Sequence, residues 1–216
     1  MKQLIACTTI FCATILNAFA QTDEKAKAIL NDVSKKYQTF NTIKADFSCT
    51  IDNPQAKIKD TQLGTLTSLP KVNKYRITLK GQEFTSDGKS QWTYLKADKE
   101  IQINDIDNNS DTFNPAKIFT IYEKGFKYLY VEDLKIKGKA YHIIDLVPLN
   151  SHRSFFKIRL QIDKASKLIT NALIFEKDGN RYTYAIRSFT PNIKVAETMF
   201  TFDPKKYPGV EVVDLR

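Results

Sequence analysis

The sequence predicts an α+β fold made mainly of antiparallel strands, an incomplete curled β-barrel of about 11 strands with a helical lid over an apolar cavity. Two observations lead to this prediction. Much of the chain consists of short alternating runs separated by turns that are too short for the crossover of a parallel pair. Two further segments carry apolar residues at helical spacing, and a sheet of this width needs a cover.

The N-terminal segment is typical of a secretory signal. Lys2 provides a positive start, an apolar stretch runs from Leu4 to Leu16, and Ala18-Phe19-Ala20 is a small-x-small cleavage motif. We therefore expect residues 1–20 to be removed and residues 21–216 to form one periplasmic domain.

Composition supports a single globular domain. The 216 residues are 42% hydrophobic and include seven Gly and seven Pro. This Gly and Pro content is too low for a long disordered linker. The formal net charge is +9. Because an exported chain rarely meets nucleic acid and most lysines alternate with apolar residues, we expect a solvated basic face and no nucleic-acid binding, with attraction to anionic membranes left open.

Cys49 is the only cysteine after the signal segment. We therefore expect it to be a small buried hydrophobe, and we expect no internal disulfide.

The elements follow in order along the chain. Apolar residues recur at helical spacing from Thr22 to Gln38, which predicts an amphipathic helix. The period then changes to two, and strands are predicted at residues 43–51, 57–69, 74–80, 82–86, 91–96 and 99–104. Asp87 and Gly88 mark a hairpin turn between two of them.

A second, short helix is predicted from Pro115 to Lys124, after a polar loop. Asn114 resembles an N-cap, Pro115 suits the first helical position, and Gly125 is a terminator. Ile118, Phe119 and Tyr122 would form its apolar stripe. Five more strands are then predicted, at residues 126–132, 139–147, 155–163, 168–176 and 181–189.

The chain lacks the sequence patterns of metal and catalytic sites. Its two histidines, His142 and His152, have no accompanying zinc motif, and no nucleophile elbow, P-loop or dinucleotide fingerprint is present. We therefore expect no catalytic residue, no metal and no cofactor, and a structural role for His142.

Aromatic residues are frequent in the predicted strands and helices. Each one alone suits a core, but a set spread over a sheet too wide to fill itself can also line a pocket for a long apolar ligand. This set comprises Phe47, Tyr75, Trp92, Tyr94, Phe119, Tyr122, Tyr128, Tyr130, Tyr182 and Tyr184.

Several motifs resemble one known family. They are Ile43–Ser48 (IKADFS), Gly64 with Pro70 and Lys74–Ile77 (KYRI), Ser86–Tyr94 (SDGKSQWTY), and the closing Phe200–Pro204 and Pro208–Asp214. Over nearly the whole mature chain, the sequence resembles the LolA-type outer-membrane lipoprotein carrier proteins, in the branch found in Bacteroidetes-like bacteria.

The resemblance implies a monomeric periplasmic carrier. It would take acylated lipoproteins from an inner-membrane ABC-type exporter to the outer membrane or a receptor there. The residues expected to contact lipid are Phe47, Tyr75, Ile77, Leu79, Trp92 and Tyr94 on the barrel and Ile118, Phe119 and Tyr122 on the lid.

One departure concerns the lid. Many family members have an arginine just before the proline corresponding to Pro70, where it helps to hold the lid closed, and here that position is Leu69. Lys71, Lys74 and Arg76 are candidates to replace it, although lysine lacks the planar fork of arginine.

The same fold could serve two other classes of function, a sensor or regulator and an enzyme. A periplasmic sensor or regulator of lipoprotein could use the same fold, but such proteins usually append a second domain. An enzyme would need an acid and a base inside the lumen, and alternation places Lys44, Asp46 and Glu83 on the face opposite the apolar set.

Overall fold

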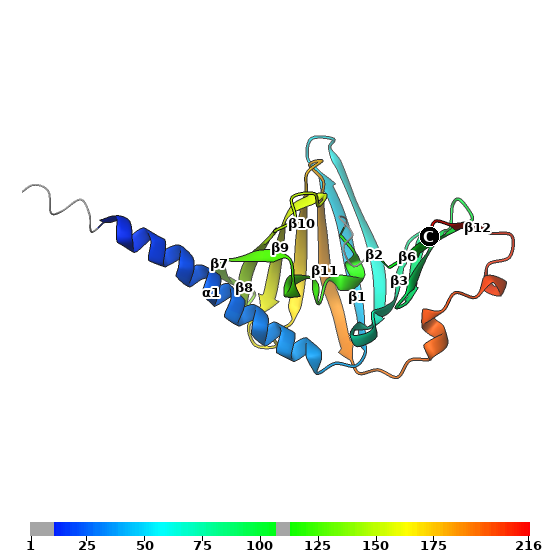
Figure 1. The fold of residues 1–216 in the computed structure, drawn as a ribbon, viewed down its shortest axis with the longest axis horizontal. Helices are drawn as coiled ribbons and strands as arrows, with labels where there is room; N and C mark the ends of the chain where they lie inside the picture. The colour runs from blue at the N-terminus through cyan, green and yellow to red at the C-terminus, as the bar shows by residue number, and fades with distance from the viewer. Residues whose placement is uncertain (1–10, 107–112) are drawn as a thin grey trace, which may run out of the picture.

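The computed structural model describes residues 11–106 and 113–216, which form one α-helix and one sheet of 12 strands (Figure 1). Half of the expected leader, residues 1–10, and the centre of the expected polar loop, residues 107–112, lie outside these ranges. The mainly antiparallel, open and curled sheet is the architecture that the sequence predicts.

The sheet consists of two antiparallel meanders that meet where β1 pairs with β11. The first meander contains β1 (Ile43–Asn53), β2 (Ile58–Leu69), β3 (Lys74–Leu79), β4 (Gln82–Asp87), β5 (Ser90–Leu95) and β6 (Glu100–Asp105). The second contains β7 (Phe126–Ile136), β8 (Lys139–Pro148), β9 (Phe155–Asp163), β10 (Ile169–Glu176) and β11 (Arg181–Pro191). A twelfth strand, β12 (Glu211–Asp214), was not expected from the sequence, and it pairs in parallel with β6 at one edge.

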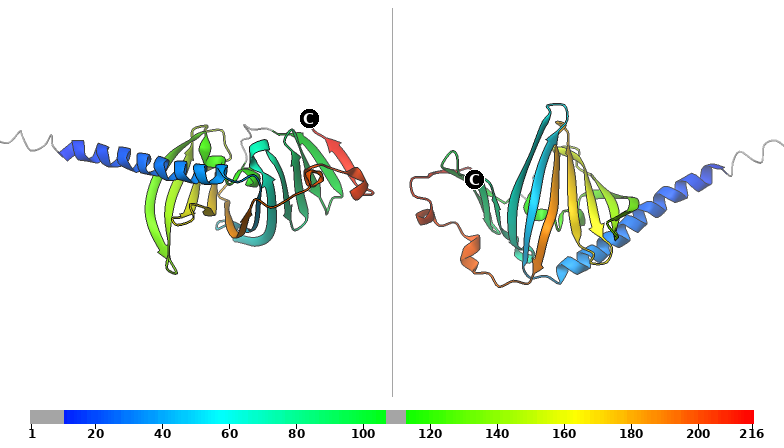
Figure 2. Two further views of the ribbon diagram at one scale, coloured as in Figure 1. Left: turned by 90° about the horizontal axis from the view of Figure 1, so that it is seen from below. Right: turned by 180° about the vertical axis from the view of Figure 1, so that it is seen from behind.

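The helix α1 (Phe11–Gln38) crosses the sheet from β7 to β10, and we call the face that it covers the inner face (Figures 1 and 2). Its buried stripe is Ala26, Leu30, Val33 and Tyr37, which is the amphipathic pattern read from the sequence. At its C-terminal end the Tyr37 hydroxyl accepts a hydrogen bond from the backbone N–H of Ile169, at 3.1 Å. No helix within the described residues is long and apolar enough to cross a membrane.

The prediction of a second α-helix at Pro115–Lys124 is wrong. The segment instead forms two 3₁₀ helices, η2 (Pro115–Lys117) and η3 (Ile121–Glu123). β-branched residues in so short a segment disfavour an α-helix, while three residues per turn place Phe119 and Tyr122 on the same side. Asn114 caps η2 as expected, because its side chain accepts a hydrogen bond from the backbone N–H of Ala116. We call residues 113–123 the lid.

The lid is anchored under α1 by its aromatic residues. Ile118, Phe119 and Tyr122 are all nearly fully buried. The Phe119 ring stacks on that of Tyr37, with a centroid distance of 5.1 Å. The lid therefore shares its core with α1 and the inner face of the sheet.

The C-terminal segment covers the opposite, outer face of β3 to β6. It contains η4 (Glu197–Phe200) and η5 (Pro204–Lys206) before β12 and runs past this half of the sheet (Figure 1). Phe200 is fully buried, and the Tyr207 hydroxyl donates a 2.8 Å hydrogen bond to Glu83. The two halves of the sheet are thus covered on different faces.

We predict that Phe119→Ala lowers the free energy of unfolding by about 3–5 kcal/mol, because it removes a buried ring and leaves a cavity. Urea denaturation followed by circular dichroism measures the change. The control Lys124→Ala removes an exposed side chain nearby and should change stability by less than about 0.5 kcal/mol. A similarly small change for Phe119→Ala would place the lid in solvent and contradict the packing.

We also predict that Gly64→Ala destabilises the first meander. A Cβ atom at Gly64 would lie 2.6 Å from Cζ of Phe47 and 2.7 Å from Cδ2 of Leu79, its cross-strand neighbours. Overpacking of this kind costs about 1–3 kcal/mol. In a Phe47→Leu background the cost should fall by about half or more, since the ring is gone. An equal cost in both backgrounds would show that the Phe47 ring is not what excludes a side chain at position 64.

Candidate binding cavity

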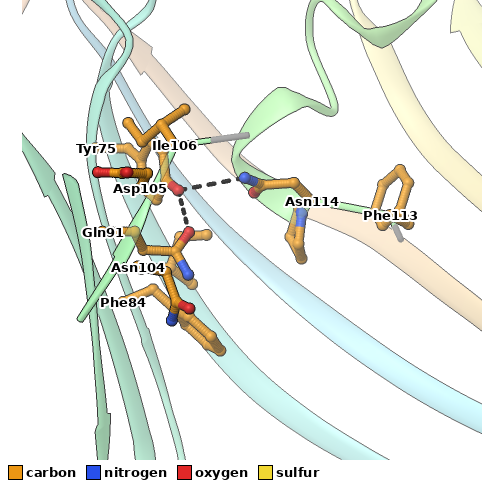
Figure 3. A pocket seen from close by; sticks show the side chains of 10 residues that line it. Tyr75, Phe84, Gln91, Asn104, Asp105, Ile106, Phe113 and Asn114 are labelled. Atoms are coloured by element: carbon orange, nitrogen blue, oxygen red, sulfur yellow. Dashed lines mark hydrogen bonds between the residues drawn. The ribbon is translucent and has the colours of Figure 1, made fainter. Parts of the chain in front are cut away.

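A cavity of about 390 Å³ lies between the lid and the wall made by β3 to β6 (Figure 3). The wall contributes side chains from four neighbouring strands, and the lid contributes its first residues. The lining residues are Tyr75, Ile77, Phe84, Gln91, Asn104, Asp105, Ile106, Phe113, Asn114 and Pro115.

A second cavity of about 430 Å³ adjoins the first and extends between the two meanders. The two cavities share Phe84, Phe113 and Pro115, so the lid separates and closes both. Each volume lies within the range of about 300–1,000 Å³ that is common for small-ligand sites. The remaining lining residues of the second cavity are Cys49, Ile51, Gln62, Leu79, Lys80, Gln82, Ile174, Glu176, Tyr182 and Tyr184.

Alternation directs one side of each strand inward, and the wall of the second cavity is mainly apolar, whereas the first cavity is lined by apolar and polar side chains in similar proportion. Ile77 pairs with Phe84 across β3 and β4, and both side chains line the first cavity. Burial raises the pKa of the Cys49 thiol, which favours the neutral form. Cys49 therefore acts as a small hydrophobe in the wall of the second cavity, as its place in an alternating strand indicates.

Three of the polar side chains that line the first cavity are joined by hydrogen bonds. The Tyr75 hydroxyl donates a hydrogen bond to Oε1 of Gln91, and Nδ2 of Asn114 donates to the Tyr75 hydroxyl at 3.2 Å (Figure 3). Nε2 of Gln91 in turn donates to Oγ1 of Thr93, at 3.2 Å. Burial raises the pKa of Tyr75 above its usual value, so the phenol is protonated and able to donate at neutral pH.

These hydrogen bonds connect the lid to the wall, whereas the basic residues expected at the lid have other partners. Lys71 donates to Oδ1 of Asn41 at 2.8 Å, Lys74 forms an ion pair with Glu197, and Arg76 forms one with Glu83 at 2.7 Å. The last two lie on the outer face. The described contacts therefore connect the lid to the wall through Asn114 and Tyr75, with no cation in that link.

The structure brings several of the expected ligand-contacting residues together. Tyr75 and Ile77 line the first cavity and Leu79 lines the second. Phe47 packs over Gly64 and beside Tyr184, where it lines a shallower depression that it shares with Leu79. Ile118, Phe119 and Tyr122 lie in the core beneath α1 and line neither of the two cavities, so their place is to anchor the lid.

The expected position of Trp92 and Tyr94 in the cavity wall is wrong. Trp92 pairs with Thr85 and Tyr94 with Glu83, which places both on the outer face. The Trp92 ring stacks on Phe202 at 6.1 Å, and the Tyr94 ring meets that of Tyr207 at 4.9 Å. The C-terminal segment covers these rings, and the inward residues of β5 are Gln91, Thr93 and Leu95.

The lining residues that were not identified from the sequence include Phe84, Gln91, Phe113 and Asn114. The two strand residues could have been found from the Asp87–Gly88 turn. The two residues between β4 and β5 are Gly88 and Lys89, and a loop of this length pairs Ser86 with Gln91 and puts Gln91 in the row of Ser86 and Tyr75. Phe113 and Asn114 carry no comparable signal, because the placing of the lid depends on the tertiary fold.

The described residues include no group of three or more His, Cys, Asp and Glu side chains that could hold a metal. His142 instead contacts Oδ1 of Asp133 through Nδ1, at 2.7 Å. Three charged residues occur in the linings, namely Asp105 in the first cavity and Lys80 and Glu176 in the second, and of these Asp105 and Lys80 are exposed. The geometry thus suits binding of an apolar ligand.

Comparisons with known proteins agree with this geometry. A family model described as the outer membrane lipoprotein carrier protein LolA matches residues 38–203. No curated protein matches the chain by sequence. Among solved structures, an uncharacterized conserved protein from Thermus thermophilus has a TM-score of 0.55 and 15% sequence identity, covering 88% of this chain and 99% of that one.

A second solved structure is an outer membrane lipoprotein-sorting protein domain from Vibrio parahaemolyticus. It has a TM-score of 0.50 and 14% sequence identity, and the match covers 82% of this chain and 97% of that domain. At such identities the solved structures show a shared fold alone. The family match is broader evidence, since residues 38–203 include the whole sheet except β12, both cavities and the lid. The chain therefore belongs to the LolA family of outer membrane lipoprotein carrier proteins.

Proposed function

We propose that this protein is a periplasmic carrier that binds the acyl chains of lipoproteins and shuttles them from the inner to the outer membrane. The observation that carries the proposal is the pair of adjoining cavities under one lid, of which the second is mainly apolar and the first combines apolar and polar side chains. The lid is held by side-chain packing and hydrogen bonds, so it can open and close reversibly.

The energetics of acyl burial suit such a carrier. Each buried methylene contributes about 0.8 kcal/mol, so about ten methylenes in the cavities would contribute on the order of 8 kcal/mol. A chain of that size needs a protein cover to cross water. The apolar walls supply this cover without a covalent bond, and Ile77, Leu79 and Phe84 would contact the methylenes directly. No step requires catalysis.

The N-terminal leader supports the proposed location. We propose that residues 1–20 are removed, that residues 21–216 form one monomeric carrier domain, and that an inner-membrane ABC-type exporter loads it. Delivery would be to the outer membrane or to a receptor there. Removal of Lys2 with the leader lowers the formal net charge from +9 to +8, which suits a protein that approaches anionic membrane surfaces at both ends of its path.

The leading test is extraction of the purified protein with organic solvent, followed by mass spectrometry. Stoichiometric acyl lipid supports the carrier. A protein that is free of lipid and also fails to bind an added triacylated lipopeptide would defeat the proposal.

A pair of adjacent substitutions tests which face holds the ligand. Leu79 is half-buried in the wall of the second cavity, whereas Thr78 is exposed on the other side of β3. We predict that Leu79→Glu lowers transfer of a labelled triacylated lipopeptide to acceptor vesicles at least about tenfold, because it puts an unpaired carboxylate among acyl methylenes. Thr78→Glu should transfer normally.

Circular dichroism controls for folding of both variants. If Leu79→Glu stays folded and transfers normally while Thr78→Glu does not, the cargo binds the outer face. Normal transfer by both folded variants would exclude this strand from the binding site.

A further inference from the structure

We propose that Tyr75, Gln91 and Asn114 form the binding site for the ester or amide carbonyl that joins an acyl chain to its cargo. We call these residues the polar trio. The inference rests on the proposed function and deepens it, because it specifies the ligand as a neutral acyl ester or amide.

The position of the polar trio suits a boundary between the acyl chain and its polar group. Tyr75 comes from β3, Gln91 from β5 and Asn114 from the lid, and their polar atoms converge in the first cavity (Figure 3). Ile77 and Phe84 line the same cavity beside them, and Phe84 continues into the second cavity. An acyl chain along this wall would place its carbonyl beside the trio. A few convergent polar groups in an apolar pocket commonly fix the orientation of a ligand.

The polar trio offers donors that match a carbonyl oxygen. The Tyr75 side chain is only 2% exposed, and its hydroxyl already donates to the amide carbonyl of Gln91. An ester or amide carbonyl of a ligand is the same kind of acceptor and can take the place of Gln91, whose side chain is half-buried and rotatable. A primary amide carries two N–H donors, so Asn114 can donate to a ligand while it keeps its bond to Tyr75.

The polar trio is neutral, so it favours a neutral carbonyl group of a ligand over a charged carboxylate. The charged residue nearest to it in the lining, Asp105, is exposed and pairs with Ser90, so it lies in the outward row of β6. Asn104 is the inward neighbour and pairs with Gln91. A free fatty acid would bring its carboxylate to a place where no cation lines the described cavity, and an unpaired buried charge is costly.

The proposal is tested with two synthetic lipopeptides of the same peptide and chain length. One carries two palmitoyl chains as glyceryl esters, and the other carries two hexadecyl chains as glyceryl ethers, which lack the carbonyl oxygen. Dissociation constants are measured by fluorescence titration of the full mature protein. We expect Tyr75→Phe to weaken binding of the ester about 3- to 10-fold, the usual loss for one hydrogen bond. Binding of the ether should change by less than about twofold.

A matched control is Tyr94→Phe, which removes a phenol hydroxyl from the outer face of β5 and should leave both dissociation constants unchanged. A second variant, Asn114→Ser, removes the amide donor and retains a side chain that can cap η2. It should also weaken binding of the ester more than that of the ether. Palmitate should compete for the wild-type site more weakly than its methyl ester does.

The possible outcomes separate this inference from the proposed function. Equal weakening of ester and ether by Tyr75→Phe would show that the trio only fastens the lid, and would overturn the inference while the carrier stands. Equal competition by palmitate and methyl palmitate would also overturn it. If neither lipopeptide binds the wild-type protein, the proposed function itself fails.

Discussion

The structure depends on one constraint. The described residues contain one α-helix and a sheet of 12 strands, and this helix is too short to cover the whole inner face. α1 fills the inner face from β7 to β10, where Ile144, Ile158 and Leu160 are completely buried. It does not extend over β3 to β6. Among the described residues, the lid covers the inner face there, and its side chains border one cavity on this half and a second one between the two meanders. Burial of apolar surface drives the packing of the first half, and incomplete burial in the second half creates the binding space.

Strand alternation then decides which side chains reach this space. A shift of one residue moves every side chain of a strand to the other face. In β3, Tyr75 and Ile77 point inward, while Arg76 forms an ion pair with Glu83 on the outer face. The same outer row receives Tyr207 of the C-terminal segment. Charged residues of β3 and β4 therefore hold the outer cover, and the inward residues of β3 to β5 are neutral.

Much of the fold could be predicted from the sequence because alternation and short turns are local signals. The face of Trp92 could not be judged from hydrophobicity alone, since an aromatic residue also suits an outer face that another segment buries. Its true place follows from the Asp87–Gly88 turn, which sets the register of the hairpin. β12 is too short to show a pattern and pairs in parallel, so only the tertiary fold determines it. The segment predicted as the α-helix of the lid forms 3₁₀ turns instead, because it is short, contains β-branched residues and packs under α1.

The lid is held by different forces along its length, and this bears on how the cavity opens. Around η3, Phe119 and Tyr122 are nearly fully buried beneath α1, and each such side chain contributes about 2–3 kcal/mol or more. Within η2 no residue is buried, and the hydrogen bond from Asn114 to Tyr75 has a net contribution of about 1 kcal/mol. The half-buried Phe113 ring adds contacts with Tyr184 at 5.3 Å and Phe155 at 6.4 Å. Opening from the η2 side therefore costs less than lifting the whole lid. That side is also the one that covers both cavities, through Phe113 and Pro115. A ligand carbonyl that competes for Tyr75 would thus act on the weaker attachment and leave the anchor under α1 in place.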